Sequence, residues 1–211
     1  MAIVKGVDTV SNVTNILTQI KNQGYSYVIR YYSINGNSKR MGAAGAAEIA
    51  NAGLKRVSVY QNLHNSYSKF SAAIAAGDAT DAIAQAKSVG HSSGTIYFAV
   101  DYDAYGSNVT NNVVPYFKEV NRYLGAQEIK YNVGVYASRV CCNKVSELNL
   151  AKYSYVRDMS YGSGGNMAVH MPKNWAFDQF AEITYNGIGI DKVNASGKDV
   201  GVSKLDEDGS N

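Results

Sequence analysis

Four aspartates stand where buried strands are expected to end, and side chains at such positions can carry chemistry. Asp8 follows the first apolar run, Asp101 and Asp103 close the run that begins at Thr95, and Asp178 lies in a late aromatic segment. Two neighbouring carboxylates oppose each other's ionisation, so the pKa of one of them rises. Such a pair supplies an acid and a base from one residue type, as the cleavage of a glycosidic bond requires.

The central pair is the most informative of these positions. Side chains alternate between the two faces of a strand, so Asp101 and Asp103 are expected to share a face with Tyr97 and Ala99. Two residues advance a strand by about 6.6 Å, which places both carboxylates within reach of one small substrate group. Alternatives are a site for Mg²⁺ or Ca²⁺ and, for Asp103, the N-terminal cap of the next helix.

The other two aspartates also have structural explanations. Asp8 precedes a helical pattern that begins at Val10 and could cap that helix, or it could face Asp101 from the floor of a barrel. Aromatic neighbours would desolvate Asp178 and raise its pKa, unless it is an edge-strand residue paired with a lysine.

Several polar and aromatic residues near predicted strand ends could bind a hydroxylated ligand. The chain has 17 Tyr against 5 Phe, a composition that suits a sugar-binding groove as well as a solvated surface. The candidates are Arg30, Tyr32, Tyr60, Gln61, Tyr136 and Trp175. For any single aromatic residue, ordinary core packing is the simpler explanation.

Strand and helix patterns alternate over most of the chain. Strand-forming runs are predicted at 2–7, 25–32, 54–60, 95–101, 132–136 and 153–158. Helical patterns are predicted at 10–23, 43–51, 70–76, 80–89, 113–124 and 139–148. Beyond them, a loop is expected at 161–166, a weaker strand at 175–180, and a short strand with turns within 188–202. This order predicts parallel strands joined by helical crossovers.

Eight strand units favour one domain over residues 1–211, a compact (β/α)8-type (TIM-like) barrel with short or missing C-terminal helices. At 211 residues it would be smaller than the usual barrel of about 250 residues. The alternative is an open doubly wound sheet. The sequence has no Gly-x-Gly-x-x-Gly after the first strand and no Walker loop, which weakens a nucleotide-binding sheet of that kind.

Composition excludes several classes of function. The 20 Lys and Arg residues against 17 Asp and Glu give no basic excess, so no nucleic-acid partner is expected. The sequence contains no run of 18 apolar residues, so no membrane-spanning helix is expected. The adjacent Cys141 and Cys142 are expected to be free thiols, and three scattered histidines predict no zinc site. The N-terminal residues do not resemble a signal peptide, which leaves another export route, a removed leader or a larger parent protein.

Four segments, in this order, resemble the glycoside-hydrolase-like family known as domain of unknown function 1906. They are Lys5-Gly-Val-Asp8, Tyr97-Phe-Ala-Val-Asp-Tyr-Asp103, Val133-Gly-Val-Tyr136 and Trp175-Ala-Phe-Asp-Gln-Phe180. That family is similar to the glycoside hydrolase family 25 lysozymes, barrel enzymes that cut the muramic acid–glucosamine link of peptidoglycan. The resemblance implies a barrel that acts on bacterial cell-wall glycan without a cofactor, in the cell wall or outside the cell, fused to or delivered by other domains.

The resemblance also implies roles for individual residues. Asp103 would be the acid and Asp101 the nucleophile or stabiliser, with Asp8 and Asp178 positioning and tuning them. Gln179 falls near the late Trp-Gln-Tyr segment of the lysozymes and Asp199 on their closing aspartate, and both are expected to bind substrate.

One departure from the lysozyme pattern bears on activity. Asp103 stands where the lysozymes have a glutamate that is longer by one methylene, and a misplacement of about 1 Å can cost on the order of 100-fold in rate. A non-catalytic glycan-binding module on the same barrel is therefore the alternative. A barrel phosphodiesterase is a third class, but it needs paired histidines or a metal cluster that this sequence does not offer.

Overall fold

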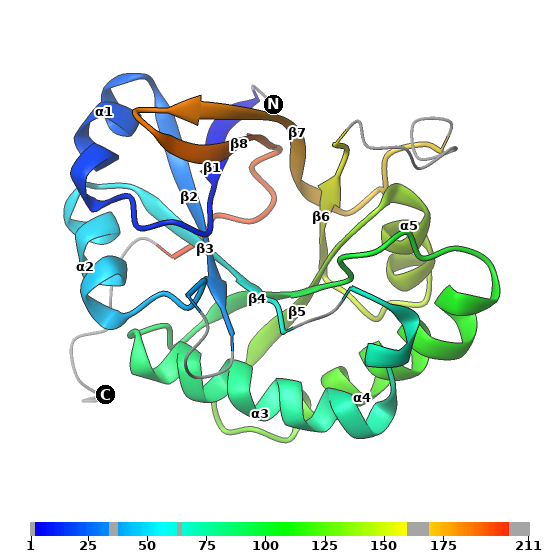
Figure 1. The fold of residues 1–211 in the computed structure, drawn as a ribbon. Helices are drawn as coiled ribbons and strands as arrows, with labels where there is room; N and C mark the ends of the chain where they lie inside the picture. The colour runs from blue at the N-terminus through cyan, green and yellow to red at the C-terminus, as the bar shows by residue number, and fades with distance from the viewer. Residues whose placement is uncertain (1–2, 34–37, 63–64, 160–168, 203–211) are drawn as a thin grey trace.

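The computed structural model describes residues 3–33, 38–62, 65–159 and 169–202. Eight strands form a closed barrel in chain order, and the helices lie around its outside (Figure 1). The strands are β1 (Val4–Asp8), β2 (Tyr25–Tyr32), β3 (Lys55–Tyr60), β4 (Gly94–Ala99), β5 (Tyr131–Ala137), β6 (Tyr153–Arg157), β7 (Trp175–Tyr185) and β8 (Ile188–Ala195). The predicted barrel is confirmed, and the open sheet is wrong.

Five α-helices cover the barrel among the described residues. They are α1 (Leu17–Asn22), α2 (Ala43–Asn51), α3 (Ala72–Ser88), α4 (Val114–Gly125) and α5 (Arg139–Glu147). Short helical turns precede three of them: η1 (Thr14–Ile16), η2 (Tyr67–Lys69) and η3 (Val109–Val113). The two helices predicted at 70–89 form the single helix α3. The loop predicted at 161–166 lies outside the described residues.

The last two strands depart from the alternation of strand and helix. Strands β1 to β7 pair in parallel, whereas β8 runs antiparallel to both β7 and β1. The turn between β7 and β8 consists of Asn186 and Gly187, with φ of 49° and 79°. Two residues with positive φ form the hairpin turn whose twist matches the strands on either side. A hairpin therefore replaces the last helical crossover.

Buried side chains form one layer inside the barrel and another between the strands and the helices. In β4, Tyr97 and Ala99 belong to the inner layer, whereas Ile96 and Phe98 face the helices, as their alternation predicted. The small residues Ala75, Ala79, Ala82 and Ala86 form the buried face of α3.

The segment after β8 closes the amino-terminal end of the barrel. Val202 and Arg56, near the start of β3, exchange two backbone hydrogen bonds of 2.8 Å. Asp199 accepts a hydrogen bond from the buried Tyr97 hydroxyl at 2.6 Å and another from the Gly201 amide at 3.0 Å. Gly201 has a φ of +62°, and a Cβ there would lie 2.8 Å from the Arg56 carbonyl oxygen, so only glycine fits this closure.

Gly134 in β5 makes room for the ring of Tyr97 inside the barrel, because a Cβ at this position would lie 2.5 Å from Tyr97 Cδ1. Gly134→Ala is expected to lower the free energy of unfolding by about 1–3 kcal/mol, measured by urea denaturation. The matched control is Gly77→Ala in α3, where a Cβ meets nothing within 4 Å and a gain of about 0.5–1 kcal/mol is expected. Unchanged stability in Gly134→Ala would contradict this packing.

Candidate active site

Asp8, at the carboxyl end of β1, is fully buried inside the barrel. Its Oδ2 accepts hydrogen bonds from the hydroxyls of Tyr155, at 2.7 Å, and Tyr31, at 3.0 Å. Its Oδ1 has no hydrogen-bond partner among the described residues. Burial raises the pKa of Asp8 to about 7, the charge of Asp191 adds to this rise, and the tyrosine hydrogen bonds and the charge of Arg30 oppose it.

A second inward-facing carboxylate, Asp191 of β8, lies directly opposite Asp8 in the antiparallel pair of β1 and β8. Opposed residues share one face of a sheet, so both carboxyl groups lie on the inside of the barrel. Gln179 donates to Asp191 Oδ2 at 2.6 Å, and Tyr136 donates to the amide oxygen of Gln179 at 2.7 Å. Burial and the charge of Glu182 raise the pKa of Asp191 to about 6, but its side chain, unlike that of Asp8, is partly exposed.

Asp101 and Asp103 follow β4 and share one guanidinium group. Arg157, the last residue of β6, approaches Asp103 Oδ1 at 3.1 Å and Asp101 Oδ1 at 4.0 Å. Gln61, just after β3, donates to Asp101 Oδ2 at 2.5 Å and accepts from the Lys39 ammonium at 2.8 Å. The side chains of Asp101 and Asp103 are 34% and 49% exposed, so both are accessible to a ligand.

The hydroxyl of Tyr136 lies inside the barrel, donates to Gln179, and is affected by the charges of these groups. The pKa of Tyr136 is raised well above its ordinary value by burial and then by the charges of Asp8, Asp101 and Asp191. Arg157 acts on the same hydroxyl in the opposite direction. Because charge interactions weaken with distance, these side chains lie near one another, at the carboxyl ends of the strands.

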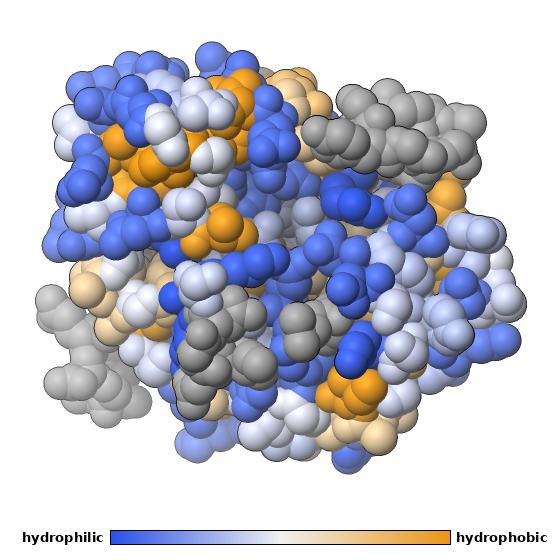
Figure 2. Space-filling model, viewed as in Figure 1, coloured by the Kyte–Doolittle hydropathy of each residue, from blue (hydrophilic) through white to orange (hydrophobic). Residues whose placement is uncertain are grey.

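Hydrophilic side chains surround the middle of the face seen in Figure 2, whereas hydrophobic ones gather over α1 and the β7–β8 hairpin. The hairpin is tied to the residues around α1, because Gln23 donates to the Tyr185 hydroxyl at 2.8 Å.

The structure corrects the predicted placement of Asp178. This residue pairs with Asn194 on the outer face of β7, since its neighbours Phe177 and Gln179 point into the barrel. Burial, and next the charge of Asp158, raise the pKa of Asp178 to about 6, and the Arg139 guanidinium that binds Asp158 lowers it. Asp178 therefore belongs to a cluster outside the barrel.

Two predicted tyrosines also face outward. The hydroxyl of Tyr32 lies 2.8 Å from His91 Nδ1, and that of Tyr60 donates to Asp78 of α3 at 3.2 Å. The residues that reach the site are their neighbours in sequence, Tyr31 and Gln61. A ligand-binding role for Tyr32 and Tyr60 is therefore corrected to a role in the outer core.

Two further predicted residues lie at the opposite end of the barrel. Trp175 begins β7 and packs against the outer core, and Asp199 is bound to Tyr97 in the amino-terminal closure. Arg30 is buried and donates to the Val10 carbonyl at 3.4 Å, so it acts on Asp8 through its charge rather than by direct contact. Four residues that lie with the strand-end aspartates were not predicted from the sequence: Tyr31, Tyr155, Arg157 and Asp191.

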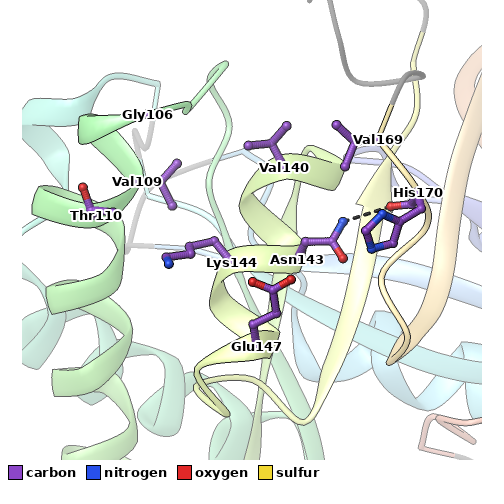
Figure 3. A pocket seen from close by; sticks show the side chains of 9 residues that line it. All are labelled: Gly106, Val109, Thr110, Val140, Asn143, Lys144, Glu147, Val169 and His170. Atoms are coloured by element: carbon purple, nitrogen blue, oxygen red, sulfur yellow. Dashed lines mark hydrogen bonds between the residues drawn. The ribbon is translucent and has the colours of Figure 1, made fainter.

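A cavity of about 370 Å³ lies outside the barrel, between η3 and α5 (Figure 3). Its lining is largely apolar, with Val109, Val140 and Val169 beside Lys144 and Glu147. The strand-end aspartates do not line it. Within the described ranges, no group of three or more His, Cys, Asp or Glu side chains could hold a metal ion, and no helix is long and apolar enough to cross a membrane.

The chain is a closed α/β barrel with acidic side chains at the carboxyl ends of its strands, and its sequence matches a glycoside-hydrolase-like domain. Residues 18–196 match the family described as Rv2525c-like, glycoside hydrolase-like domain, and the chain belongs to this family. The resemblance read from the four sequence segments is thereby confirmed.

Two relatives come from Bacillus subtilis strain 168. The uncharacterized protein YbfG is 40% identical over 217 residues, which cover 94% of this chain and 29% of YbfG. The uncharacterized protein FadG is 37% identical over 213 residues, which cover 95% of this chain and 37% of FadG. The chain thus spans about a third of the length of these relatives.

Solved structures share the fold at low sequence identity. The Mycobacterium tuberculosis Tat-secreted protein Rv2525c in complex with L-tartrate has a TM-score of 0.75 and 22% identity, covering 92% of this chain and 96% of its own. The Streptococcus pneumoniae modular autolysin LytC in complex with a synthetic peptidoglycan ligand has a TM-score of 0.61 and 15% identity. The match covers 91% of this chain and 46% of the autolysin. The muramidase of Acremonium alcalophilum has a TM-score of 0.58 and 13% identity. The match covers 92% of this chain and 94% of the muramidase.

Proposed function

We propose that this domain hydrolyses the glycan of the bacterial cell wall, as a muramidase does, with the carboxylates at the mouth of the barrel. The observation that carries the proposal is the division of these carboxylates into two kinds. Asp8 and Asp191 have raised pKa values, whereas Asp101 and Asp103 contact Arg157. Carboxyl groups whose environments differ in this way can divide acid and base roles between them. The muramidase and the autolysin that share the fold support the choice of substrate.

Asp101 is the residue best placed to stabilise positive charge on the sugar. The transition state of glycoside hydrolysis resembles an oxocarbenium ion, which a fixed carboxylate stabilises. Gln61 orients Asp101 by a hydrogen bond, and the side chain of Asp101 is exposed enough to meet a substrate. Asp8 is fully buried, so its role is to tune the field inside the site rather than to touch the glycan.

The site of action that goes with this substrate is the cell wall or the space outside the cell. The Tat-secreted relative and the peptidoglycan-bound autolysin support it. Because the chain spans about a third of YbfG and FadG, we propose that further domains carry this barrel to its substrate.

One observation favours the second candidate, a glycan-binding module without turnover. Arg157 contacts both Asp101 and Asp103, so each of these carboxylates already has a cationic partner. A site of this kind can bind sugar hydroxyls without cleaving the glycan, because Asp103, at the position of the lysozyme acid, is then an ion-paired carboxylate and not an acid.

The deciding experiment incubates the wild-type domain with purified bacterial peptidoglycan and counts new reducing ends. Borohydride reduction followed by acid hydrolysis then identifies the sugar at the new end. The expected result is reduced muramic acid, in equal amounts for wild type and for the matched control Asp178→Asn, whose side chain lies outside the barrel. Sedimentation with peptidoglycan without new reducing ends would establish the binding module instead.

A further inference from the structure

Asp191 has an environment suited to giving up a proton. We propose that Asp191, and not Asp103, is the proton donor to the glycosidic oxygen. This inference rests on the proposed function and names the acid of the same site. Two aspartates face the interior from β1 and β8, and only Asp191 of β8 is partly exposed and able to touch a substrate.

Asp103 is poorly suited to the acid role. Its Oδ1 accepts a hydrogen bond from Arg157 at 3.1 Å, and an ion pair requires a carboxylate rather than a carboxylic acid. Its side chain is also half exposed, so water solvates the charge.

The surroundings of Asp191 favour its protonated form. Asp191 lies opposite Asp8 of β1 on one side and opposite Glu182 of β7 on the other. Among the described residues, no lysine, arginine or histidine forms an ion pair with Asp191. Burial of the carboxyl group, and next the charge of Glu182, raise the pKa of Asp191 to about 6, so Asp191 holds its proton more tightly than a solvated aspartate does.

A hydrogen-bonded chain fixes which oxygen carries the proton. The Tyr136 hydroxyl donates to Oε1 of Gln179, which leaves the Gln179 amide nitrogen to donate to Asp191 Oδ2. Oδ2 is therefore an acceptor, and the proton resides on Oδ1. Gln179 is a positioning residue in this arrangement, because it orients the acid and does not itself react.

Asp191 transfers its proton as the glycosidic bond breaks. The O–H bond at Asp191 Oδ1 breaks, and its proton goes to the glycosidic oxygen, which keeps the electron pair of the breaking bond to the anomeric carbon. Asp101 stabilises the positive charge on that carbon. Water then supplies a hydroxyl to the anomeric carbon and returns a proton to Asp191, so no other reactant is consumed.

The test compares Asp191→Asn on two substrates that differ in their need for an acid. On peptidoglycan, kcat/KM is expected to fall about 100-fold, the usual contribution of a general acid. On a dinitrophenyl chitooligosaccharide, whose leaving group departs without a proton, the loss is expected to stay below about 10-fold. Activity on this second substrate also reports that the variant is folded. Asp103→Asn is expected to slow both substrates by similar factors, and Asp178→Asn neither.

The outcomes separate the two proposals. If wild type cleaves both substrates but Asp103→Asn shows the selective loss on peptidoglycan, Asp103 is the acid and the inference fails while the proposed function stands. An equal loss of both activities in Asp191→Asn would show that Asp191 is not the proton donor, and the inference would fail. If wild type cleaves neither substrate, the proposed function fails, and the acid role of Asp191 fails with it.

Discussion

Replacing Asp101 by asparagine is expected to lower kcat on peptidoglycan about a thousand-fold, with little change in affinity for the glycan. The amide is nearly the same shape as the carboxylate and can still accept the hydrogen bond of Gln61. It carries no negative charge, so it loses the stabilisation of the oxocarbenium-like transition state and keeps most of the ground-state binding. A fixed group that stabilises transition-state charge contributes on the order of 100- to 1,000-fold, and Asp101 is expected at the upper end.

Two measurements on the same protein check this prediction. Reducing-end release gives kcat, and sedimentation with insoluble peptidoglycan gives the affinity. Asp178→Asn is the matched control, since it makes the same chemical change on the outer face of β7. Full turnover in Asp101→Asn would remove Asp101 from the chemistry. An unchanged kcat with weakened binding would assign it to substrate binding alone.

The fold was predictable because one pattern is repeated along the chain. Strands β1 to β6 alternate with helices, and the sequence of β4 places Tyr97 and Ala99 inside the barrel. The same alternation does not show which tyrosine of β2 faces the inside, and Tyr32 was predicted there instead of Tyr31. Both faces of a barrel strand are buried, so apolar and aromatic residues occupy both of them. Tyr31 and Tyr32 cannot then be assigned to the inside or the outside from their residue type.

The reversal of β8 explains why Asp199 was expected in the site and Asp191 was not. In a parallel strand the carboxyl end lies at the mouth of the barrel, so an aspartate after the last strand would be expected there. Because β8 is antiparallel, its first residues lie at the mouth and the residues after it lie at the other end. Asp191 therefore reaches the site, and Asp199 closes the opposite end. The sequence signal for this reversal was the short turn Asn186-Gly187, a typical hairpin turn.

Replacing Asp8 by asparagine is expected to raise the free energy of unfolding at pH 8 by about 2–4 kcal/mol. Burial raises the pKa of Asp8 from 3.8 to about 7, so the folded protein binds its proton more tightly than the unfolded chain does. The stability that this proton contributes is fully present below pH 3.8 and is lost as the pH rises through 7. A difference of about three pKa units corresponds to about 4 kcal/mol, which is the upper limit of the expected gain in the free energy of unfolding.

Asparagine has no charge to bury at any pH, and its oxygen can still accept from Tyr155 and Tyr31. Urea denaturation at pH 5 and pH 8 measures the effect: wild type should lose stability between these two values, and Asp8→Asn should lose less. The control is Asp81→Asn on the exposed face of α3, where a change within about 0.5 kcal/mol is expected. If Asp8→Asn and wild type lose stability equally between pH 5 and pH 8, then burial does not hold Asp8 protonated. Asp8 would then no longer support the proposed division of the site into protonated and ion-paired aspartates.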